Sequence, residues 1–518
     1  MNRIVVPLAL LLFLPLFGLA APFLFPGNNL LVAGTLSHLW NFVLGGYIVS
    51  TLVLILGVGV GVFILGVGNA WIIASYDFPG KKIFEWALIL PLAVPTYVMA
   101  YLFVDLLQFS GPIQSTLRNV LGMESLWFFP DPRSLGGAIW SFSFCLFPYV
   151  YLITRTAFLE RSGRLIEVSE TLGYSPFHGF VKLVLPMARP AIFAGMALAL
   201  MEVLADFGAV SYFGVQTFAT GIFKAWLSFG DRVAAVQLSL GLLSLVLLIF
   251  FIEQSSRSKL RFATASRSGP LAKTLQGKDA LFAFAFCGAT LLCGFVLPAF
   301  ALLQLLIKQG LTIDIRYLAW LRNSLAVSIL TAVISVALAI FFAYSVRLNS
   351  RLNWVNRLLG FGYALPGAVL AIGILSLLEI FQLAWWISAS MLVLVYAYLV
   401  RFLSSSLQSV EAGLTRITPS MDASAALLGL SKMQILKRVH VPLLKRSLIT
   451  AGLFVFVDVM KELPATLLLR PFNFDTLAVA TYQLAADERL AELALPSLTI
   501  VLVGLFPVLL LSRVISRP

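Results

Sequence analysis

The chain has 518 residues, of which 60% are hydrophobic and only 11% are charged, and its mean hydropathy is +0.97. A soluble globular protein is about half apolar and about a quarter charged, so water-soluble, disordered, coiled-coil and disulfide-scaffold proteins are all excluded. The net charge of +13 does not indicate a nucleic-acid partner, because the basic residues lie in the short loops between apolar segments. The composition predicts a polytopic membrane protein.

The apolar segments are long and unbroken, which predicts membrane-crossing helices and not the alternating strands of an outer-membrane barrel. Each crossing needs about 20 residues. We therefore expect an all-α fold of about 12 transmembrane helices, arranged as two tandem six-helix repeats. In chain order, the expected spans are 5–25, 42–72, 86–107, 137–155, 190–212, 234–252, 281–306, 322–346, 358–381, 387–403, 447–469 and 494–512.

Lysine and arginine gather on one side of these expected spans. With the N-terminus placed inside, the cytoplasmic segments hold 26 of the 36 basic residues. Such an excess marks the cytoplasmic side of a membrane protein, so both termini are expected in the cytoplasm. Arg3 precedes an apolar run that ends near Ala21, which is compatible with a retained first span or with a cleaved signal peptide.

A segment rich in Ser, Arg, Lys and Gly separates the two sets of spans and predicts a flexible cytoplasmic linker. Its basic residues also suit contact with anionic membrane lipid. The expected domains are an N-terminal span with a periplasmic loop (1–46), the first repeat (47–252), the linker (253–280), the first span of the second half (281–321) and the second repeat (322–513).

The chain contains an internal repeat. Gly173 is followed by Pro186 and Gly429 by Pro442, so the interval is thirteen residues in both halves and the copies are offset by 256. Six helices in each half bring both copies into the membrane from the same side. Repeats of this kind are related by an axis along the membrane normal, which favours a substrate path at the seam between them.

These loops resemble a family signature that reads E-A-A, three residues, Gly, nine residues and then Ile-x-Leu-Pro. It is the signature of the permease subunits of binding-protein-dependent ABC importers. The matching positions are Glu167, Gly173, Val184, Leu185 and Pro186 in the first half, and Ala425, Gly429 and Pro442 in the second. The second half departs from the signature at Ala423, which replaces its Glu. The stretches 460–471 and 90–95 are similar to those of the fused ferric-iron permeases within this family.

The physical chemistry of the first loop suits a part that transmits force. Residues 165–172 can form a short cytoplasmic helix, Gly173 suits a left-handed helix end, and Pro186 can open the next helix. The resemblance implies that these loops dock on an ATPase subunit, with Glu167 contacting basic groups there. An ordinary amphipathic loop helix is the alternative for either copy alone. Ala423 predicts asymmetric docking, with the first copy making the stronger electrostatic contact.

The chain itself is expected to be a transport subunit and not an enzyme. A phosphate-binding loop needs Gly-Lys followed by Ser or Thr, but both Gly-Lys pairs continue with Lys82 or Asp279. The resemblance implies no cofactor in this chain, ATP and magnesium on a partner, two copies of that ABC ATPase, a periplasmic substrate-binding protein, and a multi-pass location in the bacterial inner membrane.

Four acidic residues lie in otherwise apolar sequence. The offset of 256 takes Glu202 to Asp458 and Asp206 to Glu462. Members of each pair are four residues apart, which predicts that they share a helix face. We expect a ring of four carboxylates that guides a hard cation. The alternatives are a polar network between helices that involves Lys461, or a periplasmic mouth.

No stable metal site is expected, since three scattered histidines and three cysteines within apolar segments give no ligand spacing. The leading function is the inner-membrane permease of an importer for ferric iron, bare or chelated. The same architecture importing thiamine, polyamine or another small solute is the alternative. A secondary transporter is disfavoured by the paired loops, and a non-transporting receptor or scaffold by the duplicated acids.

Overall fold

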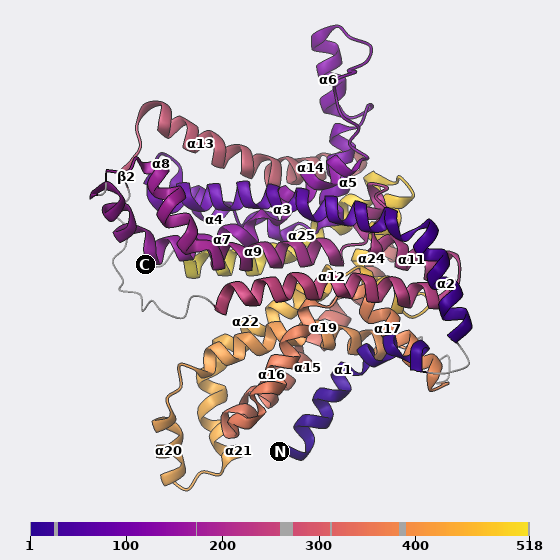
Figure 1. The fold of residues 1–518 in the computed structure, drawn as a ribbon, viewed down its shortest axis with the longest axis vertical. Coiled ribbons are helices and arrows are strands. Elements are labelled where there is room, and N and C mark those ends of the chain that lie inside the picture. Colours follow the sequence, from indigo (N-terminus) through magenta and orange to yellow (C-terminus); the bar gives the residue numbers. More distant parts are fainter. Residues whose placement is uncertain are drawn as a thin grey trace. The chain divides into compact units, whose positions relative to one another are not determined.

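The structure is a computed structural model that describes residues 2–24, 29–171, 173–258, 273–310, 313–382 and 390–515 (Figure 1). It divides into two compact units. Unit 1 comprises residues 1–38, 222–240 and 313–481, and unit 2 comprises residues 39–221, 241–312 and 482–518. Each unit therefore draws on both halves of the chain, and the division does not fall at the expected linker.

Unit 2 is built mainly from helices of the first half, together with one two-stranded parallel ladder in which Tyr76 pairs with Lys273. Its elements are α3 (Leu44–Ser75), β1 (Tyr76–Asp77), α4 (Lys81–Ala87), η2 (Leu90–Ala93), α5 (Thr96–Leu107), α6 (Pro112–Leu121), α7 (Leu135–Thr171), α8 (Pro176–Gly179), η3 (Phe180–Val184), α9 (Leu185–Ala205), α10 (Gly208–Tyr212), β2 (Lys273–Thr274), α13 (Gly277–Leu291), η5 (Leu292–Val296), α14 (Leu297–Gln309) and α25 (Leu490–Ile515).

Unit 1 is built mainly from the second half. Its elements are α1 (Asn2–Leu24), η4 (Lys224–Ser228), α15 (Ile315–Leu348), η6 (Ser350–Leu352), α16 (Asn353–Gly360), η7 (Phe361–Ala364), α17 (Gly367–Ile380), α19 (Met391–Leu414), α20 (Pro419–Leu427), α21 (Lys432–Ile435), η8 (Leu436–His440), α22 (Val441–Met460) and α23 (Pro464–Leu469). Four helices contribute residues to both units: α2 (Asn29–Phe42), α11 (Phe218–Phe223), α12 (Arg232–Ser258) and α24 (Leu477–Ala486).

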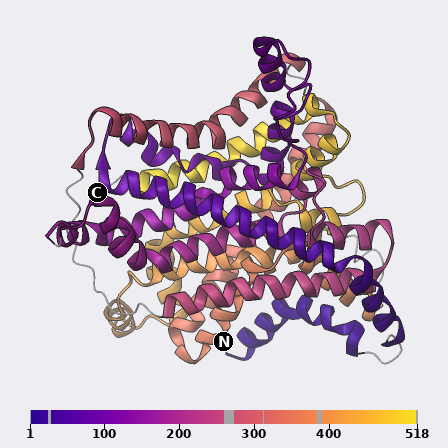
Figure 2. The same ribbon diagram turned by 45° about the horizontal axis from the view of Figure 1, so that its top comes forward.

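A triplet of packed helices forms the core of each unit. In unit 2, α3, α7 and α9 run beside one another in both views (Figures 1 and 2). Small residues bring α3 against α7, because a side chain at Gly61 would lie 2.0 Å from Ser143 and one at Gly66 would lie 2.6 Å from Val150. Helices in a bilayer gain little from apolar burial against each other, so close packing of this kind holds them together.

In unit 1 the equivalent triplet is α15, α19 and α22. A buried hydroxyl pair joins two of these helices, since Ser335 Oγ donates to Ser406 Oγ at 3.0 Å. The N-terminal helix α1 packs on α17 in the same unit, and a Cβ at Gly18 would lie 2.0 Å from the carbonyl oxygen of Gly373. The recurrence of one triplet in each unit agrees with the tandem duplication.

The prediction of an all-α polytopic membrane protein is confirmed. Among the described residues, eight helices are long and apolar enough to cross a membrane, and the number reaches ten if each of two bent pairs is one span. Two further expected spans correspond to α1, whose apolar part is shorter, and to α22, which holds Lys445, Arg446 and Asp458.

The bent pairs are a feature that apolar periodicity did not predict. Residues 81–93 and 96–121 meet at 98°, and residues 350–364 and 367–380 meet at 109°. Each bend is placed by a proline, Pro95 or Pro366, whose extended backbone precedes the first residue of α5 or α17. A proline has no N–H to continue the preceding helix, so the chain can change direction there.

Candidate coupling loops and buried carboxylates

The first loop that carries the signature lies between α7 and α9. The expected short helix over 165–172 is instead the end of α7, which runs without a break to Thr171, so the prediction of a separate helix is wrong. Continuous helical hydrogen bonding extends the span into the loop. Glu167 lies in this last part of α7, and its side chain is outside the described residues. Gly173 has φ +75°, which confirms the left-handed conformation predicted from the sequence.

The second loop does contain a separate short helix, α20. Pro419 occupies its first turn and Ala425 is its buried position. At its end, Gly429 N donates to the carbonyl of Ala426 at 2.9 Å and Leu430 N to that of Ala425 at 3.2 Å. Together with φ +82° at Gly429, these two bonds form a Schellman motif, which stops the helix at a fixed angle.

Both loops return to the membrane through a turn of π-helix at matching positions. The turns are η3 (Phe180–Val184) and η8 (Leu436–His440), which differ by the repeat offset of 256. Pro186 and Pro442 then lie in the first turns of α9 and α22, as the sequence predicted. Turns of π-helix are uncommon and are often found at functional sites. Nothing in the apolar pattern signals them.

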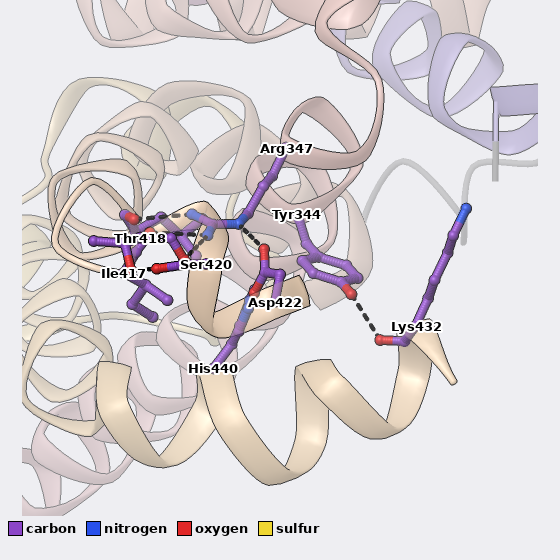
Figure 3. Close-up of polar contacts among 9 residues, drawn as sticks. Tyr344, Arg347, Ile417, Thr418, Ser420, Asp422, Lys432 and His440 are labelled. Atoms are coloured by element: carbon purple, nitrogen blue, oxygen red, sulfur yellow. Dashed lines mark hydrogen bonds and ion pairs between the residues drawn. The ribbon is translucent and has the colours of Figure 1, made fainter. Parts of the chain in front are cut away.

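A polar clamp, which we define as Arg347, Asp422 and His440, holds the second loop (Figure 3). Asp422, in the first turns of α20, accepts from Arg347 Nε at 2.8 Å through one oxygen. Its other oxygen lies 2.6 Å from Nε2 of the fully buried His440. The clamp therefore joins α15, α20 and η8, three elements that are distant in the sequence.

Arg347 also binds the segment that leads into α20. Its guanidinium donates to the carbonyl oxygens of Leu414 at 3.0 Å and Ile417 at 2.8 Å, which lie at the end of α19 and just after it. One turn earlier on α15, the hydroxyl of Tyr344 donates to the carbonyl of Lys432 at 2.7 Å. Figure 3 shows these side chains of α15 directed into the loop.

The clamp belongs to the second loop alone. The positions 256 residues before Asp422 and His440 are Ile166 and Val184, which can form no such contacts. None of the three clamp residues was predicted as a site residue, although His440 is a polar residue between the two valines before Pro442.

Helix α20 and its C-cap carry exposed apolar side chains, beside the exposed Ser420 and Ser424. Leu427 is 89% exposed and Leu428 is 82% exposed, and Met421 and Ala423 also face outward. Two adjacent leucines with this exposure, at the end of a helix that is held from behind, form a surface suited to a protein partner.

The predicted shared helix face of the acidic pairs is wrong for both pairs. Helix α9 ends at Ala205, and Asp206 has extended backbone (φ −79°, ψ 129°). Helix α22 ends at Met460, so Glu462 lies beyond the helix that carries Asp458. The spans expected at 190–212 and 447–469 are therefore each broken at the second acid. The acids themselves favour these breaks, because a carboxylate can accept the unpaired N–H groups of the short helix that follows.

Asp206 and Glu462 are buried, and their oxygens are engaged. Asp206 accepts from the hydroxyl of Thr96 and from Ala209 N at 2.7 Å. Glu462, whose side chain is 1% exposed, pairs with Arg401 Nη1 at 2.9 Å and accepts from Ala465 N at 2.9 Å.

The other two acids lie within the helices. Glu202 is half-buried on α9, and Asp458 on α22 pairs with Lys461 Nζ at 3.1 Å, a partner that the sequence analysis considered. Unit 2 holds one acidic pair and unit 1 the other. The guiding of a cation by all four stays a prediction.

The count of basic residues in the cytoplasmic segments needs one correction, at Arg401. It was counted among the bases of the cytoplasmic segments, but it lies within α19, where its side chain is 10% exposed and paired with Glu462. Its partner Glu462 lies 61 positions later in the chain, and the sequence around Arg401 does not indicate that partner. Among the described residues, no group of three or more His, Cys, Asp or Glu side chains could hold a metal ion.

Comparison with known proteins decides the family. Residues 63–261 match the model of the binding-protein-dependent transport system inner membrane component. The chain is 30% identical over 481 residues to the Fe(3+)-transport system permease protein FbpB 2 of Haemophilus influenzae, covering 90% of this chain and 89% of that protein. The chain belongs to this family of permeases.

Other members align over a shorter stretch. The sulfate transport system permease protein CysT of Escherichia coli is 32% identical over 153 residues, which is 29% of this chain and 52% of that protein. The molybdenum transport system permease protein ModB of Escherichia coli is 29% identical over 174 residues, or 34% of this chain and 71% of that protein. This permease is thus a multi-pass inner-membrane subunit of an ABC importer that works with a substrate-binding protein and an ATPase, and it is not itself an enzyme.

Proposed function

We propose that this permease forms the path by which ferric iron, delivered by a periplasmic binding protein, enters the cell. The observation that carries the proposal is the similarity to the Fe(3+) permease over 90% of the chain, whereas the sulfate and molybdenum permeases align over about a third of it. Glu202 and Asp458, the two duplicated acids that lie within helices, support it, because a trivalent ion cannot cross hydrocarbon without oxygen ligands or water.

The coupling loops are proposed to dock on two ATPase subunits, one for each loop. The exposed leucines and the rigid end of α20 support docking for the second loop, and Gly173 gives the first loop the same left-handed turn. ATP and magnesium would be bound by the ATPase subunits, with no cofactor in this chain. Both termini are proposed to lie in the cytoplasm, on the side of the basic loops.

The test is reconstitution of the complex in proteoliposomes with its binding protein and ATPase. We expect one copy of this chain with two ATPase subunits in native mass measurement, because one chain already holds both repeats. We expect ATP-dependent uptake of ferric iron. Uptake of thiamine, sulfate or molybdate with no uptake of iron would refute the substrate, and two copies of this chain in each complex would refute the stoichiometry.

Glu202 and Asp458 test the carboxylate path, since neither lies at a helix break. Glu202→Gln and Asp458→Asn should each lower ferric-iron uptake severalfold, because the first removes a negative charge that attracts the cation and the second leaves the positive charge of Lys461 without its partner. ATPase activity stimulated by the loaded binding protein should persist, since the coupling loops are unchanged. The exposed Glu124, changed to Gln, is the matched control and should have no effect. Parental uptake by both variants would leave the path without support.

A further inference from the structure

The two broken spans meet the two bent helices at equivalent junctions. In unit 2, Asp206 at the end of α9 accepts from the hydroxyl of Thr96, the first residue of α5 after the 98° bend. In unit 1, Glu462 lies beside Gly367, the first residue of α17 after the 109° bend. Each bend therefore starts where the carboxylate of the broken span makes contact.

A third helix completes each junction at the same repeat position. Cys145 on α7 and Arg401 on α19 differ by the offset of 256. The thiol of Cys145 lies 3.4 Å from the carbonyl oxygen of Val94, directly before the bend in unit 2. Arg401 pairs with Glu462 at 2.9 Å in unit 1.

The two junctions share a geometry but use different chemistry. A Cβ at Gly367 would lie 2.6 Å from Glu462 Oε1 and 2.9 Å from Arg401 Nη1. The carboxylate of Glu462 and the guanidinium of Arg401 thus occupy the space beside Gly367 that the side chain of Thr96 takes in the first half. An uncharged donor serves one junction and a cation serves the other. Two of the three pairs of positions, Asp206/Glu462 and Cys145/Arg401, differ by the repeat offset, and Thr96 and Gly367 each directly follow the proline of the bend. The two halves thus bring a carboxylate to the start of a bent helix with different residue types, which indicates a role that does not depend on one kind of residue.

The position of the junctions along the chain indicates that role. Each coupling loop leads through its π turn into one helix, α9 or α22, of about 20 residues and hence about 30 Å. Both helices are continuous over this length, with Pro190 inside α9, so a displacement of the loop is carried to the far end, where the carboxylate lies. In unit 2 the carboxylate of Asp206 is bonded to Thr96 in the first turn of α5. In unit 1 Glu462 lies against Gly367 of α17, and its hydrogen bonds go to Arg401 and to the first turn of α23.

We propose that these junctions, Thr96–Asp206 and Gly367–Arg401–Glu462, transmit the movement of the coupling loops to the bent helices α5 and α17. The four polar members are positioning residues: they act through the helices that they join and not on the substrate. Packed, hydrogen-bonded elements can carry coupling between distant sites in a protein. Whether these junctions do so is decided by measuring the coupling between transport and ATP hydrolysis.

The experiment removes one hydroxyl. Thr96→Val is nearly isosteric and abolishes the donor to Asp206, whereas Thr96→Ser keeps it. Thr116→Val is the matched control, because Thr116 is exposed on α6 and bonds only within its own helix. The complexes are reconstituted with the binding protein and ATPase, and ferric-iron uptake and ATP hydrolysis are measured together. The choice of iron as the transported ion rests on the proposed function.

We expect Thr96→Val to lower the iron taken up per ATP hydrolysed at least fivefold, while Thr96→Ser and Thr116→Val keep the parental ratio. A purely structural role would lower uptake and hydrolysis together, through loss of assembled complex, and would leave the ratio unchanged. A parental ratio for Thr96→Val would therefore overturn the proposal.

A second measurement does not need the substrate. Spin labels at the exposed positions Phe109, just after α5, and His178, in the first coupling loop, report the distance between the loop and the bent helix within unit 2. The parent and Thr96→Ser should show a change in this distance on binding ATP, and Thr96→Val should show less than half of it. An equal change in all three would refute the junction. If the parent shows the distance change but takes up no iron, the substrate is wrong and the junction stands.

Discussion

Replacing both Gly173 and Gly429 with valine should abolish uptake while the chain still inserts into the membrane. Both glycines have positive φ, +75° and +82°. A left-handed conformation costs about 1–2 kcal/mol for a residue with a side chain, and a β-branched residue is among the least tolerant of it. No atom of the described residues lies within 4 Å of a Cβ built at either position, so the penalty arises in the backbone and not from crowding.

The measurement is uptake in proteoliposomes at matched protein content. Each single valine variant should lower uptake about tenfold, as expected for a penalty of about 1.4 kcal/mol against the docked loop. Asparagine tolerates the left-handed region, so Gly173→Asn and Gly429→Asn are the matched controls and should retain most of the activity. Full transport by the double valine variant would refute the role of the loops in coupling.

Replacing Arg347 with methionine should loosen the second coupling loop. The guanidinium is bonded to Asp422 and to the carbonyls of Leu414 and Ile417. A hydrogen bond to a charged group contributes about 1.5–3 kcal/mol where it is buried, and the partial exposure of this loop reduces that contribution. We expect a loss of about 2 kcal/mol in the local opening free energy of α20. Hydrogen exchange of the α20 amides measures it directly.

Arg351→Met is the matched control, because Arg351 is an exposed arginine outside the clamp, in the segment that follows α15. It should leave exchange in α20 unchanged. Uptake should fall with Arg347→Met and not with Arg351→Met. Equal protection of α20 in both variants would show that the clamp does not hold the loop.

The clamp should also give the loop a defined response to acid. Partial burial alone would raise the pKa of Asp422, but hydrogen bonds from His440 and Arg347 outweigh it and lower this pKa. An acid with a depressed folded-state pKa contributes its stability above its unfolded-state value of about 3.9 and loses it as the pH falls further. Through this carboxylate, protection of α20 should be flat near neutral pH and should decline below about pH 4.

Much of the coupling apparatus was predictable because its determinants are local. The left-handed turns at Gly173 and Gly429 follow from the one residue without a Cβ, placed after a helix-forming run. Pro186 and Pro442 open α9 and α22 because the first turn of a helix needs no N–H from proline. Sequence alone could not indicate that the first loop helix would continue from α7 while the second is separate.

The junction residues show where local reasoning fails. The spacing of Glu202 and Asp206 predicts that they share one helix face, since four residues make about one turn. The carboxylate at the first break is bonded by the hydroxyl of Thr96, 110 positions earlier, and the carboxylate at the second break is bonded by Arg401. A helix is interrupted in a membrane only where other groups satisfy the released backbone, and those groups are brought in by packing.

The amino-acid sequence by itself determined the membrane class, the helical fold, the duplication and the position of the coupling loops. Long apolar runs leave the backbone no stable alternative to helix in lipid, and a repeat is visible without any structure. The tertiary structure alone decided which helices break, which acids are paired and which loop is clamped. Asp422, Arg347 and His440 are separated by as many as 93 positions (440 − 347). Their contacts exist only because α15, α20 and η8 pack together, and side-chain hydrogen bonds between packed elements have no signature in the periodicity of any one of them.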